Sequence, residues 1–278
     1  MSDSNVDSIN PFFSTSLFGL EKYFCDLFKL YKIRKLPKVI LLSGDKGSGK
    51  FTLSFHLINY ILSLETKKLY DAKNFKINKE SEVYKSILSN VNDNFYYLGN
   101  EENKTKTSIE NIRKLKEKFN KSTLNNKPRF TIIDDVELLN LNSANAILKL
   151  IEEPSNYDYF FLIFNKKQNI IETIKSRALE IKILFSKADK KNIYKNLLTE
   201  KNITDDFFPN QLEYYSPGTL INFLYYLNKV KFKESDNFFK TSVKLIDLYK
   251  KNKKIIYLDC VNFLLNLSSP SNHNVENY

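Results

Sequence analysis

The sequence predicts an α/β fold in which helices cover a mostly parallel sheet and further helices follow it. Apolar runs of strand length alternate with helical patterns through the first two-thirds of the 278 residues. Strand patterns then stop near residue 185, and only helical patterns follow. A glycine-rich loop comes directly after the first apolar run and opens a helix, which is the arrangement of a phosphate-binding loop.

Five short runs predict the strands of this sheet. Each is mainly apolar, as expected for a parallel strand that is buried on both faces. The third run ends in two adjacent carboxylates. The runs span residues 38–43, 94–99, 129–135, 159–165 and 179–184.

Three helical patterns lie between these strands. Residues 50–64 are apolar on most sides, so we expect this helix to be packed on both faces. Residues 108–119 carry one apolar stripe at helical spacing, which is typical of a helix that lies on a core. A third helix is expected over residues 144–153, with Ser143 as its N-cap and Pro154 as the residue that stops it.

The change of pattern near Ser186 predicts a domain boundary. We assign residues 1–185 to a phosphate-loop domain and residues 186–230 to a small helical domain that is broken by Ser-Pro-Gly at 216–218. Residues 231–278 form a third, short helical region that ends in a polar tail. The predicted chain is thus a parallel α/β domain followed by two smaller helical parts.

The composition indicates a folded protein, since 42% of the residues are hydrophobic and 14% are aromatic. Cys25 and Cys260 lie too far apart in the sequence to outline a disulfide framework or a thiolate zinc site, which fits a reducing cytoplasm. No apolar run approaches the roughly 20 residues that span a bilayer. We therefore expect a cytoplasmic protein with no membrane partner.

The formal net charge of +11 has two explanations. Lysine and arginine favour contact with the phosphates of nucleic acid. The lysines also fit an AT-rich coding sequence, because Lys, Asn, Ile, Phe and Tyr dominate the whole chain, so direct contact with DNA stays open. Arginine is informative against this background, since only a guanidinium offers a rigid fork for phosphate or carboxylate. The four arginines are Arg34, Arg113, Arg129 and Arg177.

The sequence GDKGSGKFT at residues 44–52 contains most of a phosphate-binding loop. Its backbone N–H groups and the positive end of the following helix would bind an anion, and Lys50 would neutralise the β- and γ-phosphates. The next residue normally carries a hydroxyl that binds Mg²⁺, but here it is Phe51. We therefore expect weak ATP binding, leave Mg²⁺ open and assign no metal ligand. The expected nucleotide-binding residues are Gly44, Gly47, Ser48, Gly49, Lys50 and Thr52.

Asp134 and Asp135 end the third predicted strand, where an ATPase carries carboxylates for Mg²⁺ and for the attacking water. The second of these is Glu in many such enzymes, and Asp135 is one methylene shorter. Asn165, at the end of the fourth strand, is placed to sense the γ-phosphate or the water, although Asn is also ordinary in turns. These three residues are the catalytic candidates near the loop.

Four segments resemble the AAA+ clamp-loader subunits of bacterial DNA polymerase III, and the delta-prime family most closely. They are KVILLSGDKGSGKFTL, SIENIRKL, FTIIDDVELLNLNSANAILKLIEEP and IIETIKSRALEI, within about residues 17–220. The most specific stretch is SANAILKLIEEP, which is followed at the family's spacing by Ser176-Arg177-Ala178 in place of a Ser-Arg-Cys motif. The resemblance implies that Arg177 is an arginine finger, a catalytic residue that reaches the ATP of the neighbouring subunit.

The chain departs from the family at several functional positions. No cysteine occurs between the phosphate-binding loop and the acidic strand, where the family has a four-cysteine zinc module, so no zinc is expected. Thr219 stands where motor subunits carry a sensor arginine, and Ala178 replaces the cysteine of the motif. Phe51, Asp135 and Thr219 together weaken hydrolysis by the chain itself, whereas Ala178 changes only the packing around Arg177, which stays in place.

The resemblance therefore implies a delta-prime-like stator that helps to load the sliding clamp onto primed DNA during replication. Its implied partners are the other loader subunits and, through them, the clamp and DNA; the third region would be a collar whose completeness is open. The chain would be part of a nucleotidyltransferase, the polymerase holoenzyme, with weak or absent ATPase activity of its own. One alternative is a competent motor-type AAA+ ATPase in which Thr52 takes the metal role lost at Phe51. A P-loop small-molecule phosphotransferase is the other, and the scarcity of arginine counts against it.

Overall fold

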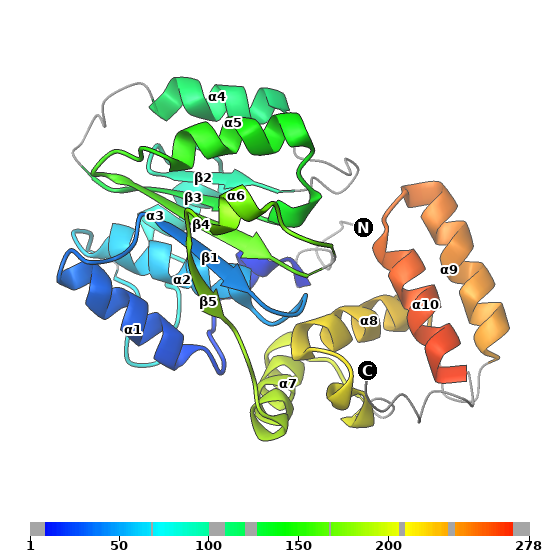
Figure 1. Cartoon of the computed structure of the whole chain (residues 1–278). Coiled ribbons are helices and arrows are strands. Elements are labelled where there is room, and N and C mark those ends of the chain that lie inside the picture. Colours follow the sequence, from blue (N-terminus) through cyan, green and yellow to red (C-terminus); the bar gives the residue numbers. More distant parts are fainter. Residues whose placement is uncertain are drawn as a thin grey trace.

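The computed structural model describes residues 9–67, 69–99, 109–119, 127–166, 168–205, 209–232 and 237–268. Strands and helices alternate along the first part of the chain, and helices follow (Figure 1). The predicted α/β class and the five predicted strands are confirmed. Within these ranges, no helix combines the length and the hydropathy that crossing a membrane requires.

The sheet is parallel throughout, and its strand order is β2-β3-β4-β1-β5. Its strands are β1 (Val39–Ser43), β2 (Phe95–Leu98), β3 (Arg129–Ile133), β4 (Asp158–Phe164) and β5 (Leu179–Lys182). Because β1 and β3 both pair with β4, the loops that follow these three strands meet at one edge of the sheet. Ligand sites of open parallel sheets form at this edge, outside the carboxyl ends of the strands.

Helices cover both faces of the sheet (Figure 1). One face packs against α1 (Glu21–Lys32), α2 (Lys50–Ser63) and α3 (Glu82–Leu88), and the other against α4 (Ile109–Phe119), α5 (Leu141–Ile151) and α6 (Glu172–Lys175). Strand β1 shows why its run is continuously apolar: Ile40 and Leu42 enter the first core, whereas Val39 and Leu41 enter the second. The sequence patterns did not predict α1, α3 and the short α6.

Helix α2 is buried on nearly all sides because it lies between the sheet and the helices α1 and α3, as its composition predicted. His56 on this helix is fully buried. Its Nδ1 lies 2.8 Å from the hydroxyl of Tyr70, and its Nε2 lies 3.0 Å from the carbonyl oxygen of Ser14. Burial lowers the pKa of His56 to about 4, so the ring is neutral: Nε2 donates to the carbonyl and Nδ1 accepts from Tyr70. The bond to Ser14 fastens the N-terminal segment to α2, and the bond from Tyr70 fastens the segment that follows this helix.

Helix α5 begins earlier than its sequence suggested. Its N-cap is Asn140, whose side chain accepts a hydrogen bond of 2.8 Å from the backbone N–H of Ser143. Ser143 itself lies inside the first turn and is buried, so the prediction that it caps the helix is wrong. Asn140 has the extended backbone that an N-cap requires, which Ser143 lacks within the helix. The helix ends at Ile151, before Pro154. Ser108, where the pattern of α4 begins in the sequence and which could cap this helix, lies outside the described residues.

The chain after β5 folds into helices with a core of their own. They are α7 (Lys187–Lys201), the 3₁₀ helix η4 (Pro209–Glu213), α8 (Pro217–Lys229), α9 (Phe238–Asn252) and α10 (Ile256–Ser268). Two short 3₁₀ helices, η2 (Pro11–Phe13) and η3 (Val136–Leu138), belong to the sheet domain. Ser186 begins this unit as the N-cap of α7, in a capping box with Asp189. The third helical region expected over residues 231–278 contains two helices, α9 and α10, which pack together.

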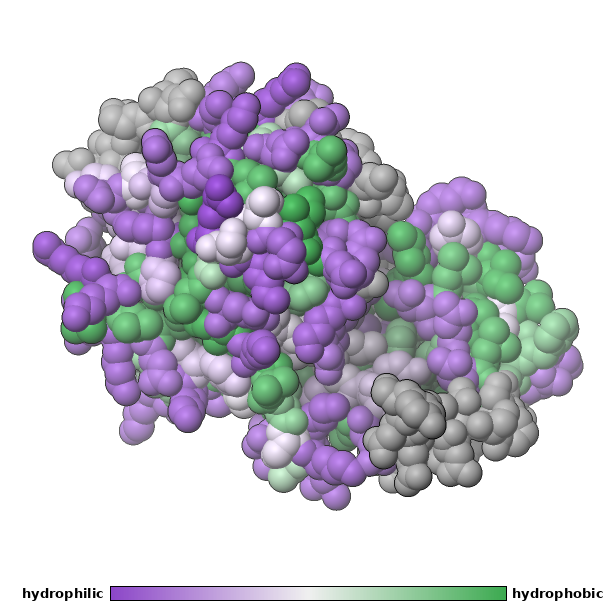
Figure 2. Space-filling view, viewed as in Figure 1, coloured by the Kyte–Doolittle hydropathy of each residue, from purple (hydrophilic) through white to green (hydrophobic). Residues whose placement is uncertain are grey.

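Apolar side chains gather on the outer surface of α9 and α10 (Figure 2). The exposed ones are Phe239, Val243, Ile255 and Leu265. Phe239 and Val243 are four residues apart and therefore lie on one side of α9. The helical unit thus presents apolar surface to the outside as well as to its core.

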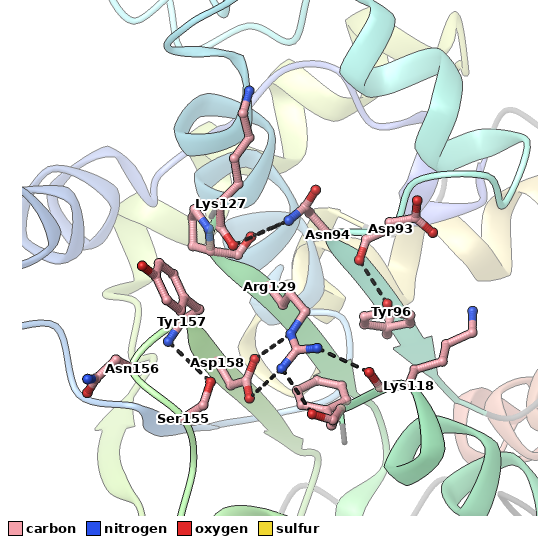
Figure 3. Close-up of polar contacts among 12 residues, drawn as sticks. Asp93, Asn94, Tyr96, Lys118, Lys127, Arg129, Ser155, Asn156, Tyr157 and Asp158 are labelled. Carbon is pink, nitrogen blue, oxygen red and sulfur yellow. Dashed lines mark hydrogen bonds and ion pairs between the residues drawn. The ribbon is translucent and has the colours of Figure 1, made fainter. Parts of the chain in front are cut away.

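A buried ion pair joins the beginnings of β3 and β4 (Figure 3). The guanidinium of Arg129 donates from Nε to Oδ1 of Asp158 at 2.6 Å and from Nη2 to Oδ2 at 3.0 Å, and the two side chains are only 6% and 4% exposed. Nη1 donates to the carbonyl oxygen of Lys118 at 3.1 Å, while the ring of Phe119 lies 4.4 Å from the guanidinium carbon. Arg129 therefore ties the end of α4 to the sheet, with the planar fork that a lysine lacks.

Replacing Asp158 by Asn should lower the free energy of unfolding by about 3 kcal/mol, because the charge of Arg129 then stays buried without its carboxylate. Urea unfolding followed by circular dichroism measures the change. The double variant Arg129→Met/Asp158→Leu removes both charges and should lose less than the single variant. A single variant within about 0.5 kcal/mol of the wild type would contradict the structural role of this pair.

Candidate nucleotide site

The candidate site lies at the carboxyl ends of β1, β3 and β4, where a cavity of about 320 Å³ opens beside the phosphate-binding loop. Small-molecule sites in proteins commonly occupy about 300–1,000 Å³, so the cavity is at the lower end of that range. The structure brings together around it Gly47, Ser48, Gly49, Lys50, Thr52, Asp134, Asp135 and Asn165. Gly44 lies in the same loop behind this lining, and Arg177 lies elsewhere.

The loop turns sharply into α2 at two glycines in the left-handed region, Gly47 with φ of 80° and Gly49 with φ of 81°. The ammonium of Lys50 folds back into this loop. It donates to the carbonyl oxygens of Gly44 at 2.9 Å and Asp45 at 2.7 Å, and to Oγ of Ser48 at 3.2 Å. A phosphate would have to draw the lysine away from these acceptors.

Lys50 is only 2% exposed. Burial lowers its pKa to about 8, although the negative charges of Asp134 and Asp45 oppose this shift. At neutral pH the ammonium therefore still carries its charge for most of the time. The cation needed to neutralise a phosphate is present, but it is held by the loop.

Phe51 occupies the place of the metal-binding hydroxyl and is 7% exposed. Its ring packs against Phe12 at 4.7 Å, Tyr97 at 5.5 Å and Phe55 at 5.7 Å between ring centroids. Thr52 lines the cavity one residue further along α2. Among the described residues, no group of three or more His, Cys, Asp or Glu side chains is arranged to hold a metal ion.

The two carboxylates after β3 accept hydrogen bonds from their own chain. The amide of Asn165 donates to Oδ1 of Asp135 at 2.7 Å and to Oδ1 of Asp134 at 3.4 Å. The hydroxyl of Tyr97 also bonds to Asp134, and burial together with the charges of both carboxylates raises the pKa of Tyr97, so this hydroxyl keeps its proton. The acids and Asn165 thus form one local network.

The first turn of α8 is hydrogen-bonded directly to the phosphate-binding loop. The hydroxyls of Ser216 and Thr219 both donate to the carbonyl oxygen of Lys46, the second at 2.8 Å. The backbone N–H of Gly218 donates to the carbonyl oxygen of Gly47 at 3.1 Å. We call this set of contacts the lid latch. Thr219, which stands where the resemblance places a sensor arginine, is therefore part of the lid latch and binds the phosphate-binding loop.

The latch depends on the small size of two glycines. A Cβ atom on Gly218 would lie 2.5 Å from the carbonyl oxygen of Gly47, and one on Gly47 would lie 2.5 Å from the side chains of Ser216 and Thr219. The ammonium of Lys46 also lies 3.5 Å from a carboxylate oxygen of Asp259, which links the loop to α10.

The wall of the cavity away from the loop is apolar. Leu17 and Phe18 come from the N-terminal segment, Ile193 and Leu197 from α7, and Ile221 from α8. An anion cradle beside an apolar wall has the make-up of a nucleotide site, since phosphate and base need opposite surroundings. The lining residues thus fit a nucleotide, but Phe51 offers no ligand for its metal.

Arg177 lies on the surface, after α6, and does not line this cavity. Its Nη2 forms an ion pair of 2.9 Å with Oε1 of Glu152, and its Nη1 donates to the carbonyl oxygen of Thr173 at 3.0 Å and to Oγ of Ser176 at 3.4 Å. Arg177 thus pairs with a local carboxylate, although this partner is Glu152 and not Glu172 or Glu180, which lie nearer in the sequence. Glu180 accepts instead from the hydroxyl of Ser43 on the neighbouring strand β1, so it is already engaged across the sheet.

The family described as "DNA polymerase III, delta subunit" matches residues 20–186 of this sequence. The chain belongs to this family. A relative from Buchnera aphidicola subsp. Schizaphis graminum, named DNA polymerase III subunit delta', is 28% identical over 159 residues, which are 57% of this chain and 46% of that protein. The delta' subunit of Buchnera aphidicola subsp. Acyrthosiphon pisum is 25% identical over 253 residues, or 88% of this chain and 75% of that protein.

A subunit named gamma is also similar. The DNA polymerase III subunit gamma of Buchnera aphidicola subsp. Acyrthosiphon pisum is 27% identical over 188 residues, covering 65% of this chain and 48% of that protein. The chain therefore spans about half the length of two of these relatives and three-quarters of the other. Membership of the family is established by the sheet domain, where the match lies.

Four residues of this member of the family were missed from the sequence. The sequence indicated Tyr97 only as part of a strand and Ser216 and Gly218 only as a break between helices. Glu152 appeared only as part of the SANAILKLIEEP segment. Their partners are 25 to 171 residues away along the chain, from Arg177 for Glu152 up to Gly47 for Gly218. The one usable signal was a serine followed by a proline, since serine is a common N-cap and proline favours the first turn of a helix.

Replacing Gly218 by Ala tests the lid latch, because the latch and helix propensity predict opposite signs for the change in the free energy of unfolding. Helix propensity alone would make the variant more stable by up to about 1 kcal/mol. The contact with the carbonyl of Gly47 predicts the opposite, a loss of about 1–3 kcal/mol from overpacking. Thermal and urea unfolding measure the change, and Thr219→Val, which removes only a hydroxyl, should lose about 1 kcal/mol or less. A stabilised Gly218→Ala variant would show that α8 does not press on the loop.

Proposed function

We propose that this chain is a delta-prime-type stator subunit of the clamp loader of a bacterial DNA polymerase III. In this role it hydrolyses ATP poorly itself and completes the ATP site of a neighbouring subunit with Arg177. Its partners are then the other loader subunits and, through the assembly, the sliding clamp and primed DNA in the cytoplasm. The relatives named delta' and the family match support this proposal.

The observation that carries the proposal is the place of Phe51. A ring that packs against three other aromatic rings fills the position from which a hydroxyl would bind Mg²⁺. Without that ligand the developing negative charge on the transferred phosphoryl group lacks its usual metal. A phosphate-binding loop that has lost this group suits occasional nucleotide binding better than turnover.

The lid latch supports the same role. In a motor subunit, nucleotide binding and hydrolysis have to move the helical unit relative to the sheet domain, which requires two arrangements of similar free energy. Here the contacts of Ser216, Gly218 and Thr219 with the loop favour one arrangement. The exposed apolar surface of α9 and α10 suits contact with other subunits.

A motor-type ATPase is the second candidate, favoured by the similarity to a relative named gamma. It would need Thr52 in the place of Phe51. Neighbouring residues on a helix point about 100° apart, so α2 would have to rotate by that angle. The rotation would pull Phe51 out of its aromatic contacts and Lys50 out of the loop, which opposes this candidate. A small-molecule phosphotransferase would be expected to have a lid with several arginines. Neither α7 nor α8 carries an arginine, so this alternative has no support.

The isolated chain should turn over ATP well below 1 s⁻¹, the lower end of the usual enzyme range of about 1–10³ s⁻¹. The physical reason is the missing metal ligand at Phe51. Steady-state phosphate release with saturating Mg²⁺ and ATP measures the rate. Lys50→Ala serves as the control for a contaminating ATPase. Turnover within the enzyme range that disappears in Lys50→Ala would favour the motor.

Arg177→Lys should leave assembly intact and slow hydrolysis at the one neighbouring site that Arg177 completes by about 10³-fold, because a lysine keeps the charge but loses the planar fork. The readout is ATP hydrolysis by the reconstituted loader with primed DNA, together with clamp loading. The matched control is Arg113→Lys, at an exposed arginine on α4.

The thermal stability of the chain distinguishes an arginine finger from an arginine that only stabilises its own loop. Arg177 is exposed, so its contacts with Glu152 and Thr173 should add little to stability and the melting temperature should hardly move. If loaders with Arg177→Lys and Arg177→Ala both hydrolyse ATP and load clamps at the wild-type rate, the role of Arg177 in trans is wrong.

A further inference from the structure

We propose that Glu152 is a built-in competitor for the phosphate that Arg177 binds, and that it holds Arg177 back until ATP in the neighbouring subunit displaces it. This inference rests on the proposed function, in which Arg177 acts in trans. It assigns to Glu152 a positioning role, because Glu152 acts on the reaction only through Arg177.

The guanidinium of Arg177 is held on two sides by partners of different kinds. Nη1 donates to a neutral backbone carbonyl, that of Thr173, and to the hydroxyl of Ser176. Nη2 pairs with the carboxylate of Glu152 at 2.9 Å. The first two partners can stay while a phosphate is bound, since neither carries charge. Glu152 cannot stay without opposing the phosphate, since both are anions and share one cation.

Glu152 stands at a place where the fold itself does not favour a negative charge. It is the C-cap of α5, and its N–H donates to the carbonyl of Leu148. The C-terminal end of a helix carries partial negative charge, so a carboxylate there is unfavourable and a cation is favourable. The pairing with Arg177 offsets this repulsion. When Arg177 binds a phosphate, Glu152 loses its partner. Pairing with Glu152 and binding of phosphate therefore exclude each other, because both use the same guanidinium.

Because the pair is partly exposed, its interaction free energy is small enough for a bound phosphate to displace Glu152. The side chains of Arg177 and Glu152 are 37% and 45% exposed, in contrast to the buried pair of Arg129 and Asp158. Exposed pairs change an equilibrium by about fivefold or less. A triphosphate with more charge than a carboxylate can therefore displace Glu152, which it could not do to a buried, bidentate partner.

The test uses the reconstituted loader with the full-length chain and measures ATP hydrolysis against ATP concentration, with and without primed DNA. Glu152→Gln keeps the shape and removes the charge. We expect the apparent KM for ATP to fall by about two- to fivefold at unchanged kcat, with the difference shrinking in high salt. Glu153→Gln is the matched control, because Glu153 is the next residue, is exposed and forms no ion pair within the described ranges. It should behave as the wild type.

The double variant Glu152→Gln/Arg177→Ala separates the inference from the proposed function. If Glu152 acts through Arg177, the double variant has the same KM and kcat as Arg177→Ala. The melting temperature of Glu152→Gln should then equal that of the control Glu153→Gln. An unchanged or raised KM in Glu152→Gln, or an effect that persists without Arg177, overturns the competitor role while Arg177 remains a finger. A wild-type rate in Arg177→Ala overturns the finger and the competitor together.

Discussion

The carbonyl oxygens of Lys46 and Gly47 accept hydrogen bonds from the first turn of α8, and the placement of the helical unit on the sheet domain depends on this contact. The donors to these two carbonyls come from a segment about 170 residues further along the chain. Two glycines allow the backbones to approach, because neither Gly47 nor Gly218 has a Cβ that would intervene. The same contact closes one side of the cavity beside Lys50.

The groups that would meet a nucleotide already have partners in the chain itself. Lys50 donates to loop oxygens, and the carboxylates of Asp134 and Asp135 accept from Asn165, with Tyr97 as a further donor to the first. Phe51 lies among aromatic rings instead of facing a metal. Buried charges without partners are costly, and here the chain itself supplies the partners of the charged groups in the site.

Arg129 and Arg177 show how burial gives the same side chain two different uses. Arg129 is enclosed, bidentate with Asp158 and stacked on Phe119, so moving it would leave a buried charge without compensation. Arg177 has a single contact with a carboxylate and is more than a third exposed, so it can exchange partners at little cost. A fixed arginine can hold a fold together, whereas an exchangeable one can respond to a second chain.

The sequence by itself determined the features that depend on neighbours along the chain. The five strands follow from continuous apolar runs, the phosphate-binding loop from its glycines and lysine, and the fold class from their alternation, because local sterics and burial on two faces set these patterns. Only the tertiary structure decided which side chains meet. The partner of Arg177 is Glu152 and not Glu172 or Glu180, since residues on different elements meet through packing and not through spacing. Thr219 binds the loop for the same reason: sequence gives its position on α8, and only the packing of α8 on the sheet domain brings its hydroxyl to Lys46.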